Sequence, residues 1–155
     1  MNDSAILGLA IAATLYGLAF PTFGGDLPQG AVSLTPSQLT WAPGRVPGVE
    51  NAALLGSSKA QRPYIERVRF PANFVIQAHT HPDQRSYTIL SGTWYIGYGD
   101  KFDETKLQAL PAGSFYTEPA GVHHFVASKD EPVVLQLSGM GPTATQLLDQ
   151  AKAPK

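Results

Sequence analysis

The segment Asn73–Gly92 reads NFVIQAHTHPDQRSYTILSG and carries two of the chain's four histidines. His79 and His81 lie two positions apart, so on a β-strand both side chains leave the same face. The other two histidines, His123 and His124, are adjacent and follow a second turn-forming stretch. Histidines that served only in packing would be scattered along the chain. The two clusters therefore predict that two strands of one β-structure direct three imidazoles toward a common point.

Short strand-like segments separated by turn residues extend from Tyr64 to Ser138. They alternate apolar and polar residues or are rich in aromatic and β-branched side chains, as strands are. The predicted strands are 64–70, 74–81, 86–90, 93–98, 114–118, 122–127 and 133–138. Strands spaced about 8–12 residues apart, with turns between them, are typical of a sandwich or barrel. The sequence therefore predicts an all-β fold, and its 155 residues suit a single domain.

The composition excludes several classes of function. The chain has 11 basic and 12 acidic residues, a net charge of −1, and no run of either sign. Nothing therefore indicates binding to nucleic acid or an electrostatic membrane patch. The absence of cysteine excludes disulfides and thiolate metal ligands, and it is compatible with any redox compartment.

The N-terminal segment differs from the rest of the chain. Ala5–Phe20 reads AILGLAIAATLYGLAF and contains no charge. It is shorter than the about 20 residues that a transmembrane helix needs, and it resembles the core of a signal peptide. Met1–Ser4 lacks the Lys or Arg expected before such a core. We expect export to the periplasm or the extracellular space, with an uncleaved membrane anchor or a buried helix as alternatives.

The same features divide the chain into four parts. Residues 1–20 form the signal-like or anchor segment. Residues 21–58 are rich in Gly, Pro, Ser and Thr and are expected to be an extended linker with an early edge strand over Val32–Trp41. Residues 59–140 form the predicted barrel, and residues 141–155 a polar C-terminal tail that is partly loose.

The spacing around the first histidine pair resembles the first motif of the cupin family of jelly-roll β-barrels. That motif is Gly, five residues, His-x-His, three or four residues, Glu, six residues and Gly. Here it reads Asn73, five residues, His79-Thr-His81, three residues, Arg85, six residues and Gly92. Asn in place of the first Gly is compatible with the motif, because Asn also adopts left-handed backbone geometry.

The second cupin motif is Gly, five residues, Pro-x-Gly, two residues, His, three residues and Asn. The chain has Gly113, five residues, Pro119-Ala120-Gly121, two residues, His124, three residues and Ser128. Only the final Asn is changed. The resemblance covers about Tyr64–Ser138 and implies a single-domain cupin jelly-roll barrel that follows the hydrophobic N-terminal segment.

Cupins commonly bind a metal through three His and one Glu, and the matching Glu position here is Arg85, which cannot ligate a cation. The resemblance therefore implies a site of His79, His81 and His124 for one divalent metal. Three imidazoles with open positions suit Fe(II), which we favour, with Zn, Ni, Mn or Cu as alternatives. A metal-free polar pocket is the competing interpretation.

Glu118 lies six residues before His124, where some three-histidine cupins that use oxygen keep a glutamate. It is expected to hydrogen-bond a ligand or metal-bound water, to act as a base, or to replace the missing Glu ligand. Strand alternation turns the neighbouring His123 away from the metal.

Three further residues are candidates for binding a substrate. Arg85 is a solvated charge, forms an ion pair with Asp83, or holds a substrate carboxylate in its guanidinium fork. Tyr95 and Tyr116 either belong to the barrel core or line the pocket with their hydroxyls.

The resemblance implies a small metalloprotein, and we expect an oxygen-dependent, dioxygenase-like oxidoreductase that acts on a small acidic or enolisable molecule. Arg85 and Glu118 are its predicted catalytic residues. The alternatives are a non-catalytic metal- or ligand-binding module, and a metal-assisted isomerase or lyase. Because cupins often dimerise, the resemblance also leaves a homodimer open as an alternative to a monomer.

Overall fold

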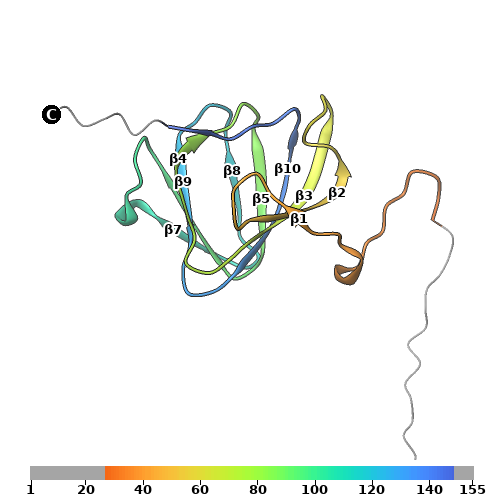
Figure 1. The fold of residues 1–155 in the computed structure, drawn as a ribbon, viewed down its shortest axis with the longest axis horizontal. Coiled ribbons are helices and arrows are strands. Elements are labelled where there is room, and N and C mark those ends of the chain that lie inside the picture. The colour runs from red at the N-terminus through yellow and green to blue at the C-terminus, as the bar shows by residue number, and fades with distance from the viewer. Residues whose placement is uncertain (1–26, 149–155) are drawn as a thin grey trace, which may run out of the picture. The chain divides into compact units, whose positions relative to one another are not determined.

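The computed structural model describes residues 27–148, which form an all-β structure of two antiparallel sheets (Figure 1). The strands are β1 (Ala42–Pro43), β2 (Glu50–Gly56), β3 (Pro63–Phe70), β4 (Val75–Thr80), β5 (Arg85–Ser91), β6 (Thr93–Tyr98), β7 (Gln108–Pro111), β8 (Phe115–Glu118), β9 (His124–Ser128), β10 (Val133–Met140) and β11 (Gln146–Leu147). One sheet has the order β1-β2-β3-β10-β5-β8, and the other has the order β11-β4-β9-β6-β7. Within the described residues, helix is limited to two 3-10 turns, η1 (Pro36–Gln38) and η2 (Glu104–Lys106). The all-β jelly-roll prediction is confirmed.

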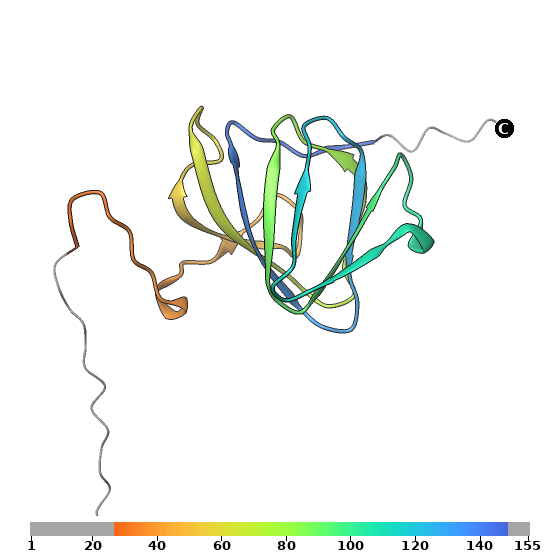
Figure 2. The same ribbon diagram turned by 180° about the vertical axis from the view of Figure 1, so that it is seen from behind.

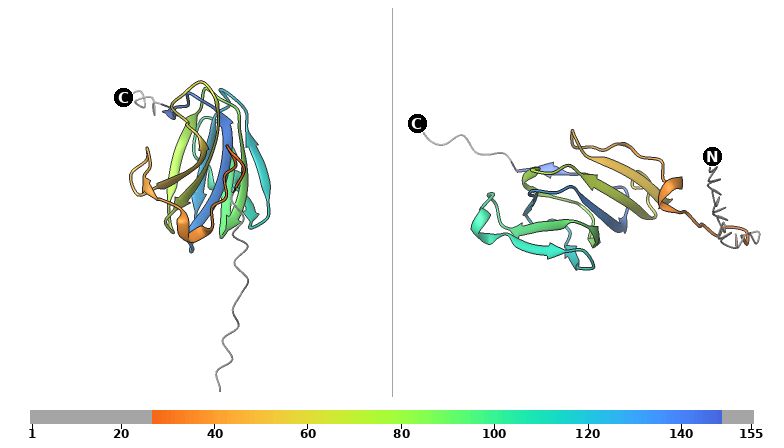
Figure 3. Two further views of the ribbon diagram at one scale, coloured as in Figure 1. Left: turned by 90° about the vertical axis from the view of Figure 1, so that its right-hand side faces the viewer. Right: turned by 90° about the horizontal axis from the view of Figure 1, so that it is seen from below.

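The two sheets face each other as the walls of a barrel (Figures 2 and 3), and the core lies between them. Alternation along each strand turns every second side chain inward. Trp94 of β6 is in this way packed in one apolar cluster with Ile89 of β5 and Leu135 of β10, all of them buried. Burial of each such side chain contributes about 1.5–3 kcal/mol to folding. Tyr87 of β5 and Tyr116 of β8 belong to the same cluster and bring polar hydroxyls into it.

Two positions of the first cupin motif have left-handed backbone geometry. Asn73 has φ of 57°, and Gly92 has φ of 74°. Asn73 therefore replaces glycine in the left-handed region, as expected. Ser128, which stands for the final Asn of the second motif, donates a hydrogen bond to the Pro71 carbonyl at 2.6 Å and accepts one from the Phe74 N–H at 3.2 Å. Its hydroxyl fastens the turn between β3 and β4.

The segment before the barrel differs from its prediction. An edge strand was expected over Val32–Trp41, but this segment holds the 3-10 turn η1. Pro36 opens the turn with a fixed φ, and the Gln38 side chain accepts the Thr35 N–H at 2.8 Å, so the chain turns instead of extending. The first strands are β1 and β2, and β2 pairs along most of β3. The six-stranded sheet thus begins upstream of residue 59.

The C-terminal end of the described chain also takes part in the fold. β11 pairs with β4 through Gln146 opposite Thr80 and Leu147 opposite His79. The first part of the predicted tail is therefore a strand of the second sheet. The signal-like segment 1–20 and residues 149–155 lie outside the described residues. Among residues 27–148, no helix has the length and apolar character needed to cross a membrane.

Candidate metal centre

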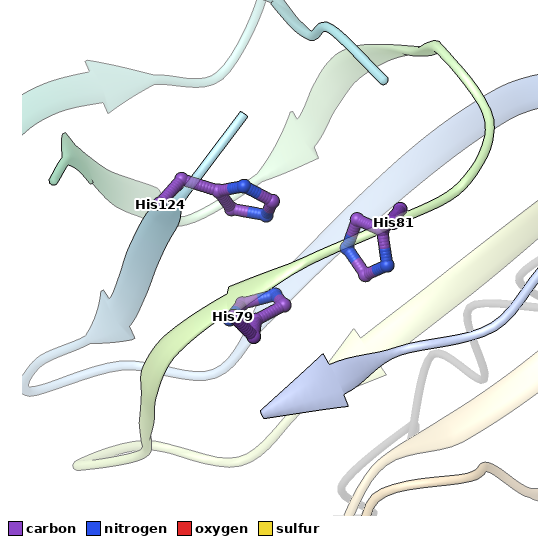
Figure 4. A group of neighbouring side chains, drawn as sticks. All are labelled: His79, His81 and His124. Atoms are coloured by element: carbon purple, nitrogen blue, oxygen red, sulfur yellow. The ribbon is translucent and has the colours of Figure 1, made fainter. Parts of the chain in front are cut away.

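Three buried imidazoles converge at one end of the barrel (Figure 4). His79 lies in β4 and His81 directly after it, and alternation points both side chains inward. His124 begins β9 and is paired directly opposite His79. The ligand atoms of the three residues all lie within 4.8 Å of one another. The structure thus brings together the three histidines that the motif spacing selected, and this group can hold a metal ion.

Each of these imidazoles makes the same kind of hydrogen bond through Nδ1, which faces a backbone carbonyl oxygen. The pairs are His79 with Gln77 at 2.8 Å, His81 with Ala144 at 2.8 Å and His124 with Val122 at 2.9 Å. Because a carbonyl oxygen can only accept, we assign the proton to Nδ1 in all three rings. The Nε2 lone pairs are therefore free to bind a metal, and the carbonyls fix the orientation of each ring.

Two further observations fit this donor set to a metal. Nε2 of His124 is buried and has no hydrogen-bond partner among the described residues. Burial, assisted by the neighbouring His124, lowers the pKa of His79 to about 4, so this imidazole is neutral at pH 7. Neutral nitrogen ligands suit Fe, Zn, Cu or Ni and not Mg or Ca, which prefer oxygen.

Glu118 supplies a carboxylate next to the imidazoles. It ends β8 and is buried, and its two oxygens lie 3.4 Å from Nε2 of His81 and 3.4 Å from Nε2 of His124. The Tyr87 hydroxyl donates to Oε2 at 2.6 Å, and the Tyr116 hydroxyl donates to Oε1 at 3.2 Å. The site therefore combines three imidazoles with one carboxylate whose orientation two phenols fix.

The two phenols form a cross-strand pair. Tyr87 of β5 is the register partner of Tyr116 of β8, and their rings stack with centroids 4.6 Å apart and an interplanar angle of 9°. Burial and the nearby Glu118 charge raise the pKa of both hydroxyls well above 10, so both stay protonated as donors. Trp94 donates its indole N–H to the Tyr116 oxygen at 2.9 Å, which extends the network into the core.

Arg85 forms the predicted ion pair. Its Nε lies 3.4 Å from both oxygens of Asp83, and both side chains are buried. Nη1 donates to the Tyr87 hydroxyl at 3.4 Å, and Nη2 donates to the Ala144 carbonyl at 3.2 Å and to the Thr143 hydroxyl. To hold a substrate carboxylate, the guanidinium of Arg85 needs two parallel N–H groups that are free to donate. In this network Nε and Nη2 already donate to other residues. The geometry thus favours the ion-pair interpretation of Arg85 over the carboxylate clamp.

Asp83 has two further partners besides Arg85. The Tyr64 hydroxyl donates to it at 2.9 Å, and so does the Thr143 hydroxyl. Burial raises the pKa of Tyr64 to about 12, so this donor stays protonated. The buried ion pair is in this way surrounded by hydrogen bonds.

Tyr95 does not line the pocket, which corrects one of the predicted binding residues. Trp94 and Ile96 of the same strand point into the core, so alternation places Tyr95 on the outer face, where its ring lies 4.8 Å from the Lys129 ammonium. His123 also points away, as predicted, and contacts Asp100 at 2.6 Å.

A cavity of about 290 Å³ adjoins the imidazoles. His79, His81, Arg85, Tyr87, Tyr116 and Glu118 provide its polar surface at the metal end. Val68, Phe70, Trp94 and Leu135 are among its apolar lining residues. A cavity in which apolar walls adjoin a convergent group of polar side chains is typical of a small-molecule site.

Sequence reasoning missed several residues of this network. Tyr87 was not among the predicted site residues, although the alternation Arg85, Tyr87, Ile89 places it beside Arg85 on the inner face. Thr143 and Ala144 lie in the predicted tail, about 60 residues from their partners, and no local pattern marks them. Only the fold brings them to the site.

Two facing antiparallel sheets with inward-pointing histidines on β4 and β9 define a cupin with a candidate metal centre. Residues 29–144 match the sequence model of the ChrR cupin-like domain, and the chain belongs to this family. No significant sequence match was found among proteins with curated functions.

Solved structures resemble the chain in fold. They include the polyketide cyclase RemF from Streptomyces resistomycificus, with a TM-score of 0.62 and 15% identity over 79% of this chain and 88% of that one. An RmlC-like cupin from Ralstonia eutropha JMP134 has a TM-score of 0.59 and 17% identity over 79% and 75%. KdgF from Halomonas sp. has a TM-score of 0.54 and 16% identity over 69% and 93%. Identities this low support the cupin fold alone.

Proposed function

We propose that this chain is a metal-dependent cupin enzyme, an oxygen-dependent oxidoreductase that acts on a small acidic or enolisable molecule. The observation that carries the proposal is the convergence of three Nε2 atoms, each ring fixed through Nδ1, beside a cavity that has both apolar and polar lining residues. His79, His81 and His124 would hold one divalent metal, with Fe(II) favoured. When bound, such a metal supplies a Lewis acid and an electron source.

Glu118 is the base of the proposed site. Its carboxylate is buried beside the three imidazoles, where the acidic proton of an enolisable substrate would lie. Tyr87 and Tyr116 hold the two oxygens with their hydroxyl hydrogens, so the carboxylate is aimed before substrate enters. A fixed base needs no reorganisation when the proton moves. Arg85 supports this arrangement through its hydrogen bond to Tyr87.

The cavity favours a substrate with an apolar body. Its walls between the two sheets are largely aliphatic and aromatic, and its volume of about 290 Å³ limits the substrate to a small molecule. Arg45 and Lys59 line the cavity and are exposed, so they would attract an anionic substrate toward the entrance. Glu66 lines the same cavity from β3, where burial raises its pKa although Arg45 opposes the shift. It offers the bound molecule a hydrogen-bond acceptor away from the metal ligands.

A second candidate function is a non-catalytic metal-binding module. The observation that favours it is the distance of 3.4 Å from the Glu118 oxygens to Nε2 of His81 and of His124. A carboxylate this close can complete a closed four-ligand site, which is typical of structural zinc. Such a site would leave no open position for substrate.

Metal analysis and oxygen uptake test the proposal together. The protein, purified without oxygen from iron-replete cells, should contain about one iron per chain and consume oxygen with a 1,3-diketone or a related enolisable acid. The His124→Ala variant should lose both properties, while His123→Ala should keep both. Tightly held zinc that resists exchange would favour the binding module. Substrate turnover that is independent of oxygen would instead indicate an isomerase or lyase.

Export remains a proposal that rests on the uncharged segment Ala5–Phe20. Expression with a C-terminal tag in a bacterial host tests it through cell fractionation and the mass of the tagged protein. A periplasmic product that lacks the segment would support a cleaved signal peptide. A full-length product in the membrane fraction would support the anchor, and a cytoplasmic full-length product would contradict both.

A further inference from the structure

The C-terminal segment Gly141–Leu148, here called the strap, crosses from the end of β10 to the edge of β4 at the metal end of the barrel (Figure 1, dark blue). The Thr143 N–H donates to the Ser58 carbonyl at 2.9 Å near its start, and the Leu148 N–H donates to the Ala78 carbonyl at 2.9 Å at its end. Between them, β11 pairs with the strand that carries His79. The strap therefore lies beside a strand that contributes to the candidate metal centre.

One metal ligand depends directly on the strap. His79 and His124 are oriented by the carbonyls two residues before them, within their own part of the chain. His81 is different, because its Nδ1 donates to the carbonyl of Ala144, a residue 63 positions away. The orientation of this imidazole therefore requires that the strap be in place.

Thr143 holds that part of the strap against the buried ion pair. Its hydroxyl accepts a hydrogen bond from Nη2 of Arg85 and donates one to Asp83. Nη2 of Arg85 also donates to the Ala144 carbonyl at 3.2 Å, the same oxygen that orients His81. The ion pair is thus linked through Arg85 to the Ala144 carbonyl, which orients His81.

We propose that Thr143 is a positioning residue, and that the strap and the metal centre are coupled through the Ala144 carbonyl. Metal binding fixes His81 and thereby holds the strap closed, while loss of the Thr143 hydroxyl loosens the strap and weakens metal binding. The two effects are reciprocal, because coupling between two sites acts equally in both directions. The inference rests on the metal centre of the proposed function and not on the reaction.

Cobalt(II) binding to the full chain, followed by visible absorption, tests the coupling. Thr143→Val keeps the shape of the side chain but removes the hydroxyl, and we expect it to weaken cobalt binding by about 10–100-fold, as the loss of a contact behind a metal ligand does. Thr143→Ser keeps the hydroxyl and should restore most of the affinity. Thr88→Val is the matched control, because alternation places Thr88 on the outer side of β5. This variant should bind cobalt as tightly as the unmodified protein does.

Hydrogen exchange of the unmodified protein provides the reciprocal measurement, which needs no variant and no substrate. Added cobalt should slow exchange of the Thr143 and Leu148 amides more than exchange of amides in β7, at the far edge of the same sheet. The inference would be overturned if Thr143→Val bound cobalt as tightly as the unmodified protein. It would also be overturned if cobalt left the exchange rates of the strap amides unchanged. If Thr143→Val does not fold, the exchange measurement decides. If the unmodified protein binds no cobalt, both the proposed metal centre and the coupling are refuted. If it binds cobalt but does not take up oxygen, the coupling stands and only the proposed reaction is refuted.

Discussion

Replacement of Asp83 by Asn should destabilise the protein far more than the loss of a surface carboxylate. Asp83 and Arg85 are 8% and 7% exposed, so the substitution leaves a buried guanidinium without its counter-charge. Breaking a buried ion pair in this way costs about 3–5 kcal/mol, which is a large part of the roughly 5–15 kcal/mol that keeps a domain folded. For a chain of this size the midpoint of thermal unfolding should fall by roughly 10 °C.

Glu50 provides the matched control for this experiment. It pairs with Arg69 at 2.6 Å, but both side chains are 43% exposed, so Glu50→Gln should cost at most about 1 kcal/mol. Urea unfolding of the metal-free proteins, followed by tryptophan fluorescence, measures both free energies. Asp83→Asn combined with Arg85→Met should recover part of the loss, because the unpaired charge is then absent. If Asp83→Asn unfolds at the same urea concentration as Glu50→Gln, the buried ion pair does not stabilise the barrel as argued.

Three other predictions separate neighbouring roles. His124→Ala should lose zinc binding in calorimetric titrations while His123→Ala keeps it, since only the former points to the centre; equal binding by both would contradict the ligand assignment. Tyr87→Phe should lower the free energy of unfolding by about 1.5–3 kcal/mol, because it removes the 2.6 Å hydrogen bond to the buried Glu118 carboxylate. Gly92→Ala should lower it by more than about 1 kcal/mol, since φ is 74° and the added Cβ would lie 2.5 Å from a carbonyl oxygen; an unchanged urea midpoint would show that the turn adapts.

The sequence predicted the fold and the convergence of the three histidines because both are encoded locally. His79 and His81 are two residues apart, and the turns at the two ends of the first motif have the left-handed geometry that Asn73 and Gly92 adopt. Alternation also predicted correctly that His123 turns outward. The same rule puts Tyr95 and Trp94 on opposite faces of their strand, but the sequence alone did not show that the Trp94 face is the buried one.

The rest of the site depends on contacts between distant parts of the chain. Ala144 orients His81 across 63 positions, and a backbone carbonyl leaves no mark in the sequence. Thr143 reaches Asp83 only because the strap crosses back to β4. The position of β2 in the sheet was similarly hidden, since Ala and Gly within it give a weak strand signal.

Arg85 occupies the position where cupins commonly carry the glutamate ligand, yet the centre still contains a carboxylate. β5 and β8 are neighbours, and their register places Glu118 directly opposite Arg85. The carboxylate therefore approaches the imidazoles from the adjacent strand, and its oxygens reach within 3.4 Å of two Nε2 atoms. Arg85 in turn is neutralised by Asp83, so its charge does not compete with a cation for Glu118. Compared with the common cupin motif, the carboxylate is thus on β8 instead of β5. Arg85, at the position of the usual Glu, instead donates hydrogen bonds to Thr143 and Ala144 of the strap. The proposed coupling between metal binding and the C-terminal end of the fold follows from this arrangement.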